Sequence, residues 1–175
     1  MKVVTKIWAS LLSATLLVLL GAMVSFWAFA QIKDAAAARK HTRDVIDHAE
    51  DFLSEIKDAE TGQRGYCLTG DEKFLGPYLA VRDILDRHLR ELRQLTLIVP
   101  AQQHVDALEP LLAAKMGEME RVIAARRAEN LPAMLAMVRG GEGKRLMDAI
   151  RAEVKAFVAL ESECKLSTTR GCSRT

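Results

Sequence analysis

The apolar residues of this chain follow two patterns, an unbroken run near the amino terminus and a regular spacing over the remainder. Residues 7–30 carry no charged side chain. From residue 45 onward, apolar side chains recur at steps of four and three, beginning with Val45, Ala49, Phe52, Ile56 and Ala59. This spacing places them on one face of an α-helix and is typical of helices that pack against one another. The pattern therefore predicts an all-α protein.

Four helical runs are predicted, separated by short joints that contain Gly or Pro. The first continues to about residue 66, because no Gly or Pro occurs between Met23 and Thr61. The second has its inward positions at Phe74, Tyr78, Val81, Leu85, His88, Leu92, Leu95 and Val99. The third uses Val105, Leu108, Leu112, Met116, Met119 and Ile123, with a bend expected at Pro110. After a short helix over 131–138 and a flexible glycine joint, the last uses Leu146, Met147, Ile150, Val154, Phe157 and Leu160.

Four amphipathic helices joined in this way predict an up-down-up-down four-helix bundle over residues 31–166. Residues 167–175 lack any apolar period and contain no acidic residue, so they are predicted to form a disordered tail.

The uncharged run is long enough to cross a membrane. As a helix, residues 7–30 would extend about 36 Å, against about 30 Å for the hydrocarbon core of a bilayer. Trp8 and Trp27 lie near its two ends, where indole side chains favour the membrane interface. We predict one N-terminal transmembrane helix. A cleaved signal peptide is the alternative, since residues 28–30 read Ala-Phe-Ala, but the run exceeds the usual apolar length of such peptides.

Charge and motif content exclude several classes of function. The 25 basic and 23 acidic residues nearly cancel, so a nucleic-acid partner is not expected. Cys67, Cys164 and Cys172 form no Cys-x-x-Cys pair, and no Glu-x-x-His motif occurs, so no metal, cofactor or catalytic site is predicted. Basic residues flank both ends of the apolar run, and the positive-inside rule therefore leaves its orientation open.

A polar segment interrupts the first helical run near its far end. Asp58, Glu60, Thr61 and Arg64 lie within two turns, and Glu60 and Arg64 have the four-residue spacing of an ion pair on a helix. The glycines at 62 and 65 weaken a helix, and their expected use is either the close approach of another helix or access to the backbone. A structural polar network and a ligand or partner surface both remain open interpretations.

Residues 58–78, with the sequence DAETGQRGYCLTGDEKFLGPY, resemble the signature of the CHASE3 domain, and residues 141–151, GEGKRLMDAIR, resemble its second signature. The resemblance covers about residues 40–163 and departs from the family at Cys67, where a larger apolar residue is usual. It implies a four-helix-bundle sensory module outside the cytoplasm, as in bacterial histidine kinases, placed between two membrane helices. It identifies no ligand, and in the second signature it marks Glu142, Lys144, Asp148 and Arg151.

The expected function is that of a single-pass inner-membrane protein with a periplasmic sensory domain and no enzymatic activity. Its partners would be the lipid bilayer and an unidentified small-molecule or protein stimulus, which it would pass on as helix movement; a homodimer through the membrane helix is a further expectation. Since the sequence ends at Thr175 without a second span or output domain, a truncated receptor is one alternative. A tethered adaptor bundle that binds another membrane protein is the other.

Overall fold

The computed structural model describes the backbone of residues 2–168 and the side chains of residues 15–163, apart from 32, 34–35 and 37–38. Throughout the described backbone the regular elements are helical, which confirms the all-α prediction. The chain divides into two compact units, Met1–His41 and Thr42–Thr175, which are described separately. The predicted tail, residues 167–175, lies almost wholly outside the described residues.

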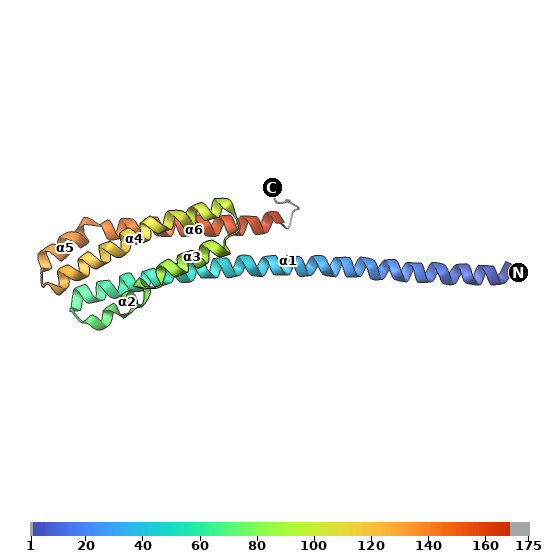
Figure 1. Ribbon diagram of the computed structural model, residues 1–175, viewed down its shortest axis with the longest axis horizontal. Coiled ribbons are helices and arrows are strands. Elements are labelled where there is room, and N and C mark those ends of the chain that lie inside the picture. The colour runs from blue at the N-terminus through green and yellow to red at the C-terminus, as the bar shows by residue number, and fades with distance from the viewer. Residues whose placement is uncertain (1, 169–175) are drawn as a thin grey trace. The chain divides into compact units, whose positions relative to one another are not determined.

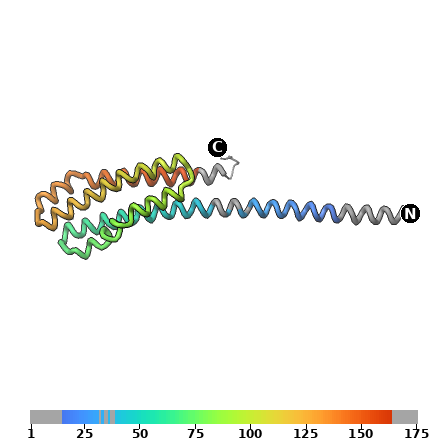
Figure 2. The backbone as a smooth tube through the Cα atoms, viewed as in Figure 1, coloured from blue at the N-terminus to red at the C-terminus, as the bar shows by residue number. Residues whose placement is uncertain are grey.

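The first unit is formed by the amino-terminal part of helix α1, which has the bounds Lys2–Thr69. Its described side chains over residues 15–31 are exposed and mostly apolar, Phe26 and Met23 among them. The Lys33 ammonium lies 5.0 Å from the centre of the Phe29 ring. Within the part of the chain that is described, no helix is both long and apolar enough to cross a membrane. The side chains of residues 7–14, a third of the predicted span, lie outside that part, and Figure 2 draws the backbone of this stretch in grey.

The second unit is a helical bundle that contains the rest of α1 and every later helix. After α1 come the 3₁₀ helix η1 (Glu72–Leu75), α2 (Gly76–Arg82), α3 (Leu85–Leu95), α4 (Val99–Arg127), α5 (Leu131–Gly140) and α6 (Glu142–Thr168). Figure 1 shows α3, α4 and α6 running alongside the last turns of α1. The joint between α3 and α4 lies at one end of the bundle, and η1, α2 and α5 lie at the other.

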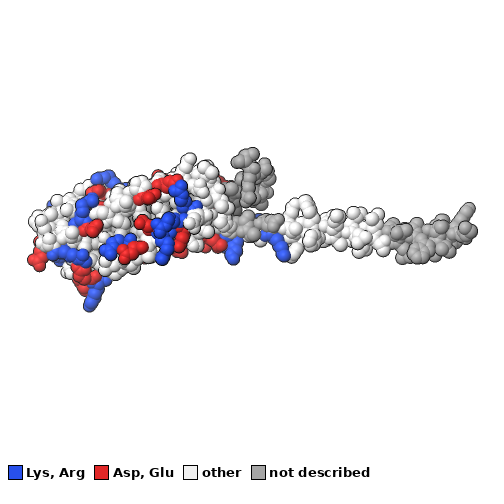
Figure 3. All heavy atoms as spheres, viewed as in Figure 1, with Lys and Arg blue, Asp and Glu red and all other residues white. Residues whose placement is uncertain are grey.

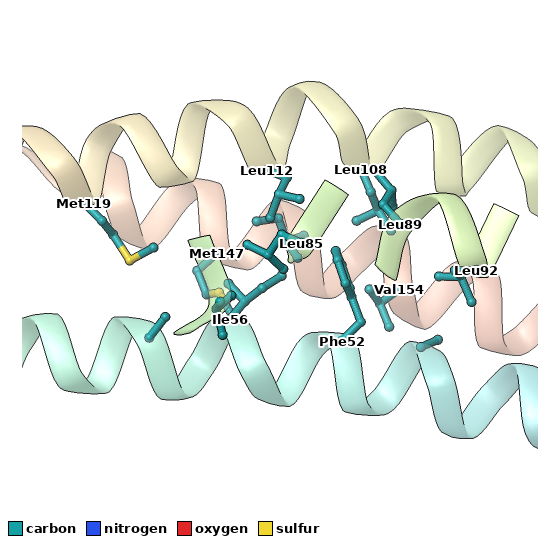
Figure 4. Close-up of a cluster of buried hydrophobic side chains, with 14 of the residues drawn as sticks. Phe52, Ile56, Leu85, Leu89, Leu92, Leu108, Leu112, Met119, Met147 and Val154 are labelled. Carbon is teal, nitrogen blue, oxygen red and sulfur yellow. The ribbon is translucent and has the colours of Figure 1, made fainter. Parts of the chain in front are cut away.

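One continuous apolar core is shared by α1, α3, α4 and α6. Phe52 and Ile56 of α1 meet Leu85, Leu89 and Leu92 of α3, together with α4 and α6 side chains that include Leu108, Leu112, Met119, Met147 and Val154 (Figure 4). All five positions from Val45 to Ala59 that the spacing selected are buried. Burial of such a stripe, at roughly 25 cal/mol per Å² of apolar area, is what stabilises helices that would be marginal alone. Charged side chains of both signs are interspersed over the visible outer face (Figure 3).

Local capping explains where the helices end. Gly70 adopts a φ of 74° directly after α1, and its N–H donates to the Tyr66 carbonyl. The Asn130 side chain accepts from the N–H of Ala133 and begins α5, as Asn at an N-cap commonly does. The joint before α6 is a single residue, Gly141, with a φ of 70°. A left-handed residue of this kind is best supplied by glycine, because it has no Cβ.

The second predicted run differs from the structure in its continuity and partly in its face. It is divided into η1, α2 and α3, with a turn at Asp83 and Ile84. Phe74 and Val99 are exposed, whereas Leu75 and Leu89 are buried. The reason at the first end is that a 3₁₀ helix has three residues per turn, so the apolar phase read from an α-helical spacing slips by one position. At the other end Val99 follows the break after Leu95 and begins a new helix.

Candidate functional site

A buried ammonium group lies at the centre of the most unusual polar site of the bundle. Lys115 of α4 has a side chain that is only 1% exposed. Its Nζ donates to Glu60 Oε1 of α1 at 3.2 Å, to Glu118 Oε2 of α4 at 3.1 Å and to the Gly143 carbonyl of α6 at 3.3 Å. An ammonium has three N–H donors, and here each has an acceptor. We call Glu60, Lys115, Glu118 and Gly143 the Lys115 network.

The helices place these groups by ordinary periodicity. Lys115 lies on the inward face of α4, between Leu112 and Met119, and Glu118 follows one turn later. Glu60 directly follows the buried stripe of α1. Gly143 lies in the first turn of α6, where its carbonyl is close to the α4 ammonium. The network therefore ties three helices together at the same level of the bundle.

Gly143 is required there because the site has no room for a side chain. A Cβ at this position would lie 2.7 Å from both carboxylate oxygens of Glu118. The absence of a side chain allows the α6 backbone to approach Glu118 and to present its carbonyl to Lys115. A glycine that the sequence pattern assigned to a flexible joint thus has a packing role inside a helix.

The charges of the network are balanced by one more residue. Arg64 Nη2 donates to Glu60 Oε1 at 2.9 Å, so two carboxylates face one buried ammonium and one guanidinium. The Glu60 and Glu118 side chains are each 8% exposed, whereas Arg64 is 66% exposed. Loss of one partner from a buried ion pair typically costs 3–5 kcal/mol, because an uncompensated charge remains. The network therefore fixes the register of α1, α4 and α6, because a shift of one helix would break a buried ion pair or hydrogen bond at a substantial cost in free energy.

The structure brings together some of the predicted polar residues and not others. Glu60 and Arg64 form the ion pair expected from their spacing. Asp58 and Thr61 are exposed, and the Thr61 hydroxyl donates to the Lys57 carbonyl of its own helix. In the second signature all four marked residues are exposed: Lys144 and Arg151 pair with Asp148, and Glu142 pairs with Arg121 of α4. These pairs lie on the surface, where each contributes little.

The glycines of the first signature, Gly62 and Gly65, lie where another helix approaches α1 closely, which is one of the two uses expected for them. A Cβ at Gly62 would overlap the Phe74 carbonyl oxygen, and one at Gly65 would lie 2.6 Å from the Phe74 ring. Phe74 itself is exposed on its other side. The two glycines therefore allow η1 to fold back against the last turns of α1.

The carboxyl end of α1 is held by arginines at the end of α4. Arg126 Nε donates to the Cys67 carbonyl at 3.1 Å. Arg127 donates from Nε and Nη2 to the two oxygens of Glu72 at 2.8 and 2.7 Å, and this hydrogen bonding lowers the Glu72 pKa. Burial, together with the nearby Glu72 carboxylate, raises the pKa of the Tyr66 phenol. Burial also raises the pKa of the Cys67 thiol, which is free.

Three residues of the Lys115 network, Lys115, Glu118 and Gly143, were not anticipated as members of a polar site. The one signal in the sequence is Lys115 itself. It lies three residues after Leu112 and four before Met119, within a series of inward positions that is otherwise apolar. A charged residue on an inward face indicates a buried partner, but the partner itself lies 55 positions away in Glu60. Across the side chains that the structure describes, no three His, Cys, Asp or Glu residues are grouped as a metal site.

Comparison with known proteins identifies the family to which this chain belongs. The CHASE3 domain matches residues 35–165. The sensor domain of the histidine kinase HK9 of Rhodopseudomonas palustris has a similar fold, with a TM-score of 0.64 and 23% identity over 71% of this chain and 98% of that one. No protein with a curated description matches. Because the family match covers most of the chain and includes both signatures, this protein belongs to the CHASE3 domain family and is a sensory domain.

Proposed function

We propose that this chain is the membrane-anchored, extracytoplasmic sensory domain of a bacterial receptor, and that it transmits a stimulus as a small displacement of helices within the bundle. It has no enzymatic role in this proposal. The observation that carries the proposal is the Lys115 network, which connects the two CHASE3 signatures through one buried ammonium. The HK9 sensor domain, which has the same fold, belongs to a histidine kinase.

The Lys115 network suits a two-position switch because its short hydrogen bonds are either formed or broken by a small movement of one helix. Helix displacements of about 1–2 Å are enough to change such interfaces. A shift of α1 by that amount would separate the 3.2 Å contact between Glu60 and Lys115 unless α4 moved with it. The ammonium therefore links the movement of α1 to that of α4 and α6. A stimulus that favours one register of these helices would bias all three.

Anchoring is supported by the uncharged residues 7–30 and by the unbroken course of α1 from Lys2 to Thr69. The helix that contains the proposed membrane segment also contains Glu60. Its first described part is apolar and exposed, as expected for residues that face lipid.

The membrane topology is tested by two reporters fused after residue 165 in bacterial cells. Alkaline phosphatase should be active in this position, and a fluorescent protein that folds only in the cytoplasm should stay dark. A bright cytoplasmic reporter with an inactive phosphatase would overturn the extracytoplasmic assignment.

The coupling role is tested by joining the chain through a second membrane helix to a histidine kinase of known activity. Replacement of the three charged residues by apolar ones, Glu60→Leu with Lys115→Met and Glu118→Leu, should leave the fold stable, because buried ion pairs are often replaceable in this way. It should nevertheless change the basal kinase output severalfold. Unchanged output from a stably folded variant would show that the network has no part in transmission.

A further inference from the structure

A half-open hollow lies between α2 and the end of α4, separate from the Lys115 network. Its volume is about 420 Å³, which is within the usual size range of small-molecule sites. Its apolar lining includes Leu79 of α2 and Ile123 and Ala124 of α4. Three charged side chains and one phenol complete the wall, namely Arg82, Glu120, Arg127 and Tyr78.

Tyr78 is the least expected member of this wall. The residue is 5% exposed, and its side chain makes no hydrogen bond within the described part of the chain. The hydroxyl is not among the enclosed polar atoms that lack a partner, so it has access to solvent, and Tyr78 lines the hollow. A phenol that is apolar along its buried body and polar at its accessible tip can exchange water for a hydrogen bond to a bound molecule.

The charged groups of the wall are of opposite sign and are only partly engaged. Arg82 donates from Nε to Asp83 at 3.0 Å, which leaves the N–H groups of both terminal nitrogens available. Glu120 makes no ion pair among the described residues, whereas Arg127 is held by Glu72. The hollow thus presents a guanidinium and a carboxylate that are not paired with each other.

These charged groups line the same hollow as Tyr78. Burial raises the pKa of the Tyr78 phenol, the charge of Glu120 raises it further, and the charges of Arg82 and Arg127 act in the opposite direction. All three charged side chains are therefore near enough to the phenol to act on it.

We propose that this hollow binds an apolar α-amino acid, a further step that rests on the sensory function proposed above. The ligand carboxylate lies against the terminal nitrogens of Arg82, which match a carboxylate in a planar pair of hydrogen bonds. The ligand ammonium lies against Glu120, and the Tyr78 hydroxyl donates to the carboxylate. The apolar side chain of the ligand covers Leu79 and Ile123.

Both charges of the ligand are needed for this fit. A simple carboxylic acid would cover Glu120 without supplying a cation, and a simple amine would cover Arg82 without supplying an anion. In either case a charged group would lose hydration and gain no partner, which is costly. A zwitterion with an apolar side chain pairs with both charged groups and also covers the apolar lining between them.

The route from the hollow to α1 is short. Arg127 lies in the wall and binds Glu72, and the Glu72 carboxylate is near enough to Tyr66, in the last turns of α1, to raise the pKa of its phenol. Occupation of the hollow would therefore act on the end of the helix that carries Glu60.

Isothermal titration calorimetry on the full chain in detergent tests the proposal with L-leucine, L-methionine and L-phenylalanine. At least one should bind, and 3-phenylpropanoate and 2-phenylethylamine, which each lack one charge of phenylalanine, should bind at least about tenfold more weakly. No binding by any of the three amino acids would overturn the proposal. Equal binding of phenylalanine and either single-charge analogue would also overturn it.

Variants identify the site. Glu120→Gln should weaken amino-acid binding by about tenfold or more and should leave the weak binding of 3-phenylpropanoate no weaker than before. Glu109→Gln, an exposed carboxylate on the same helix, is the matched control and should bind like the parent. Equal loss in both variants, or no loss in either, would overturn the assignment of the hollow. The reporter fusions are independent of this result, so failure here would leave the sensory and topological proposal standing.

Discussion

Lys115 Nζ lies 3.2 Å from Glu60 Oε1, although the two residues are 55 positions apart in the chain. This contact joins the inward face of α4 to the centre of the first CHASE3 signature. The same ammonium donates to the Gly143 carbonyl in the second signature. One side chain therefore connects the two segments that each resemble the CHASE3 family. The surface charges of the second signature, Lys144, Asp148 and Arg151, do not take part in this link.

Lys115→Ala should lower the free energy of unfolding by about 3–5 kcal/mol, because it leaves the buried carboxylates of Glu60 and Glu118 without their shared cation. Urea unfolding of the full chain followed by circular dichroism measures the change. Lys144→Ala is the matched control, since that lysine is exposed and pairs with Asp148 on the surface; it should unfold like the parent. A Lys115→Ala midpoint equal to that of Lys144→Ala would contradict the buried role of Lys115.

Gly143→Ala should destabilise the bundle by about 1–3 kcal/mol, because the new Cβ would press on both Glu118 oxygens. Gly140→Ala is the control, since no atom lies within 4 Å of a Cβ at that position and the residue is within α5. There alanine should be neutral or slightly stabilising, as its helix propensity exceeds that of glycine. Thermal unfolding of both variants decides the comparison, and an equal effect at the two glycines would count against the packing role.

Arg64→Ala should cost at most about 1 kcal/mol of stability, because the guanidinium is largely exposed and its ion pair is screened by water. The same variant placed in a kinase chimera separates two interpretations of the signature. Unchanged output with near-normal stability would assign Arg64 a minor structural role. Lost response with near-normal stability would make it part of a recognition surface.

The Glu72 carboxyl should titrate below the ordinary range of glutamate, because the Arg127 guanidinium binds its charged form. A carboxyl whose pKa is lowered by folding stabilises the fold above its unfolded pKa of about 4, and that contribution is lost as the pH falls through the lowered value. Carbon-13 NMR titration of the Glu72 carboxyl gives the pKa directly. Arg127→Ala should raise it toward the ordinary value, and an identical titration in both proteins would contradict the assignment.

Residues 40–165 alone should form a cooperative helical bundle, because α1, α2, α3, α4 and α6 all contribute side chains to one continuous core. Circular dichroism of this fragment should show mostly helix and a single sharp thermal transition. Phe52→Ala tests the origin of the cooperativity, since removal of this fully buried ring should cost about 3–5 kcal/mol. A gradual melt of the unmutated fragment would mean that further chain or a partner completes the fold.

Apolar spacing was sufficient to determine the helical class and the faces of α1, α4 and α6, and glycine content indicated a close helix approach at Gly62 and Gly65 without identifying η1 as the partner. These are local properties, because the period of a helix and the volume of a missing Cβ are both readable from neighbouring residues. The break between α2 and α3 was not predicted, since Asp83 and Ile84 contain no glycine or proline to mark it.

Only the tertiary structure decided which polar residues form the buried site. Glu60 and Arg64 could be paired from their four-residue spacing, but Asp58 and Thr61 lie on the outer side of the same helix. Lys115, Glu118 and Gly143 join Glu60 because α4 and α6 pack against α1 at one level of the bundle. The physical reason is that helical periodicity specifies an inward face, whereas the partner of an inward charge depends on the axial register between helices that are distant in sequence.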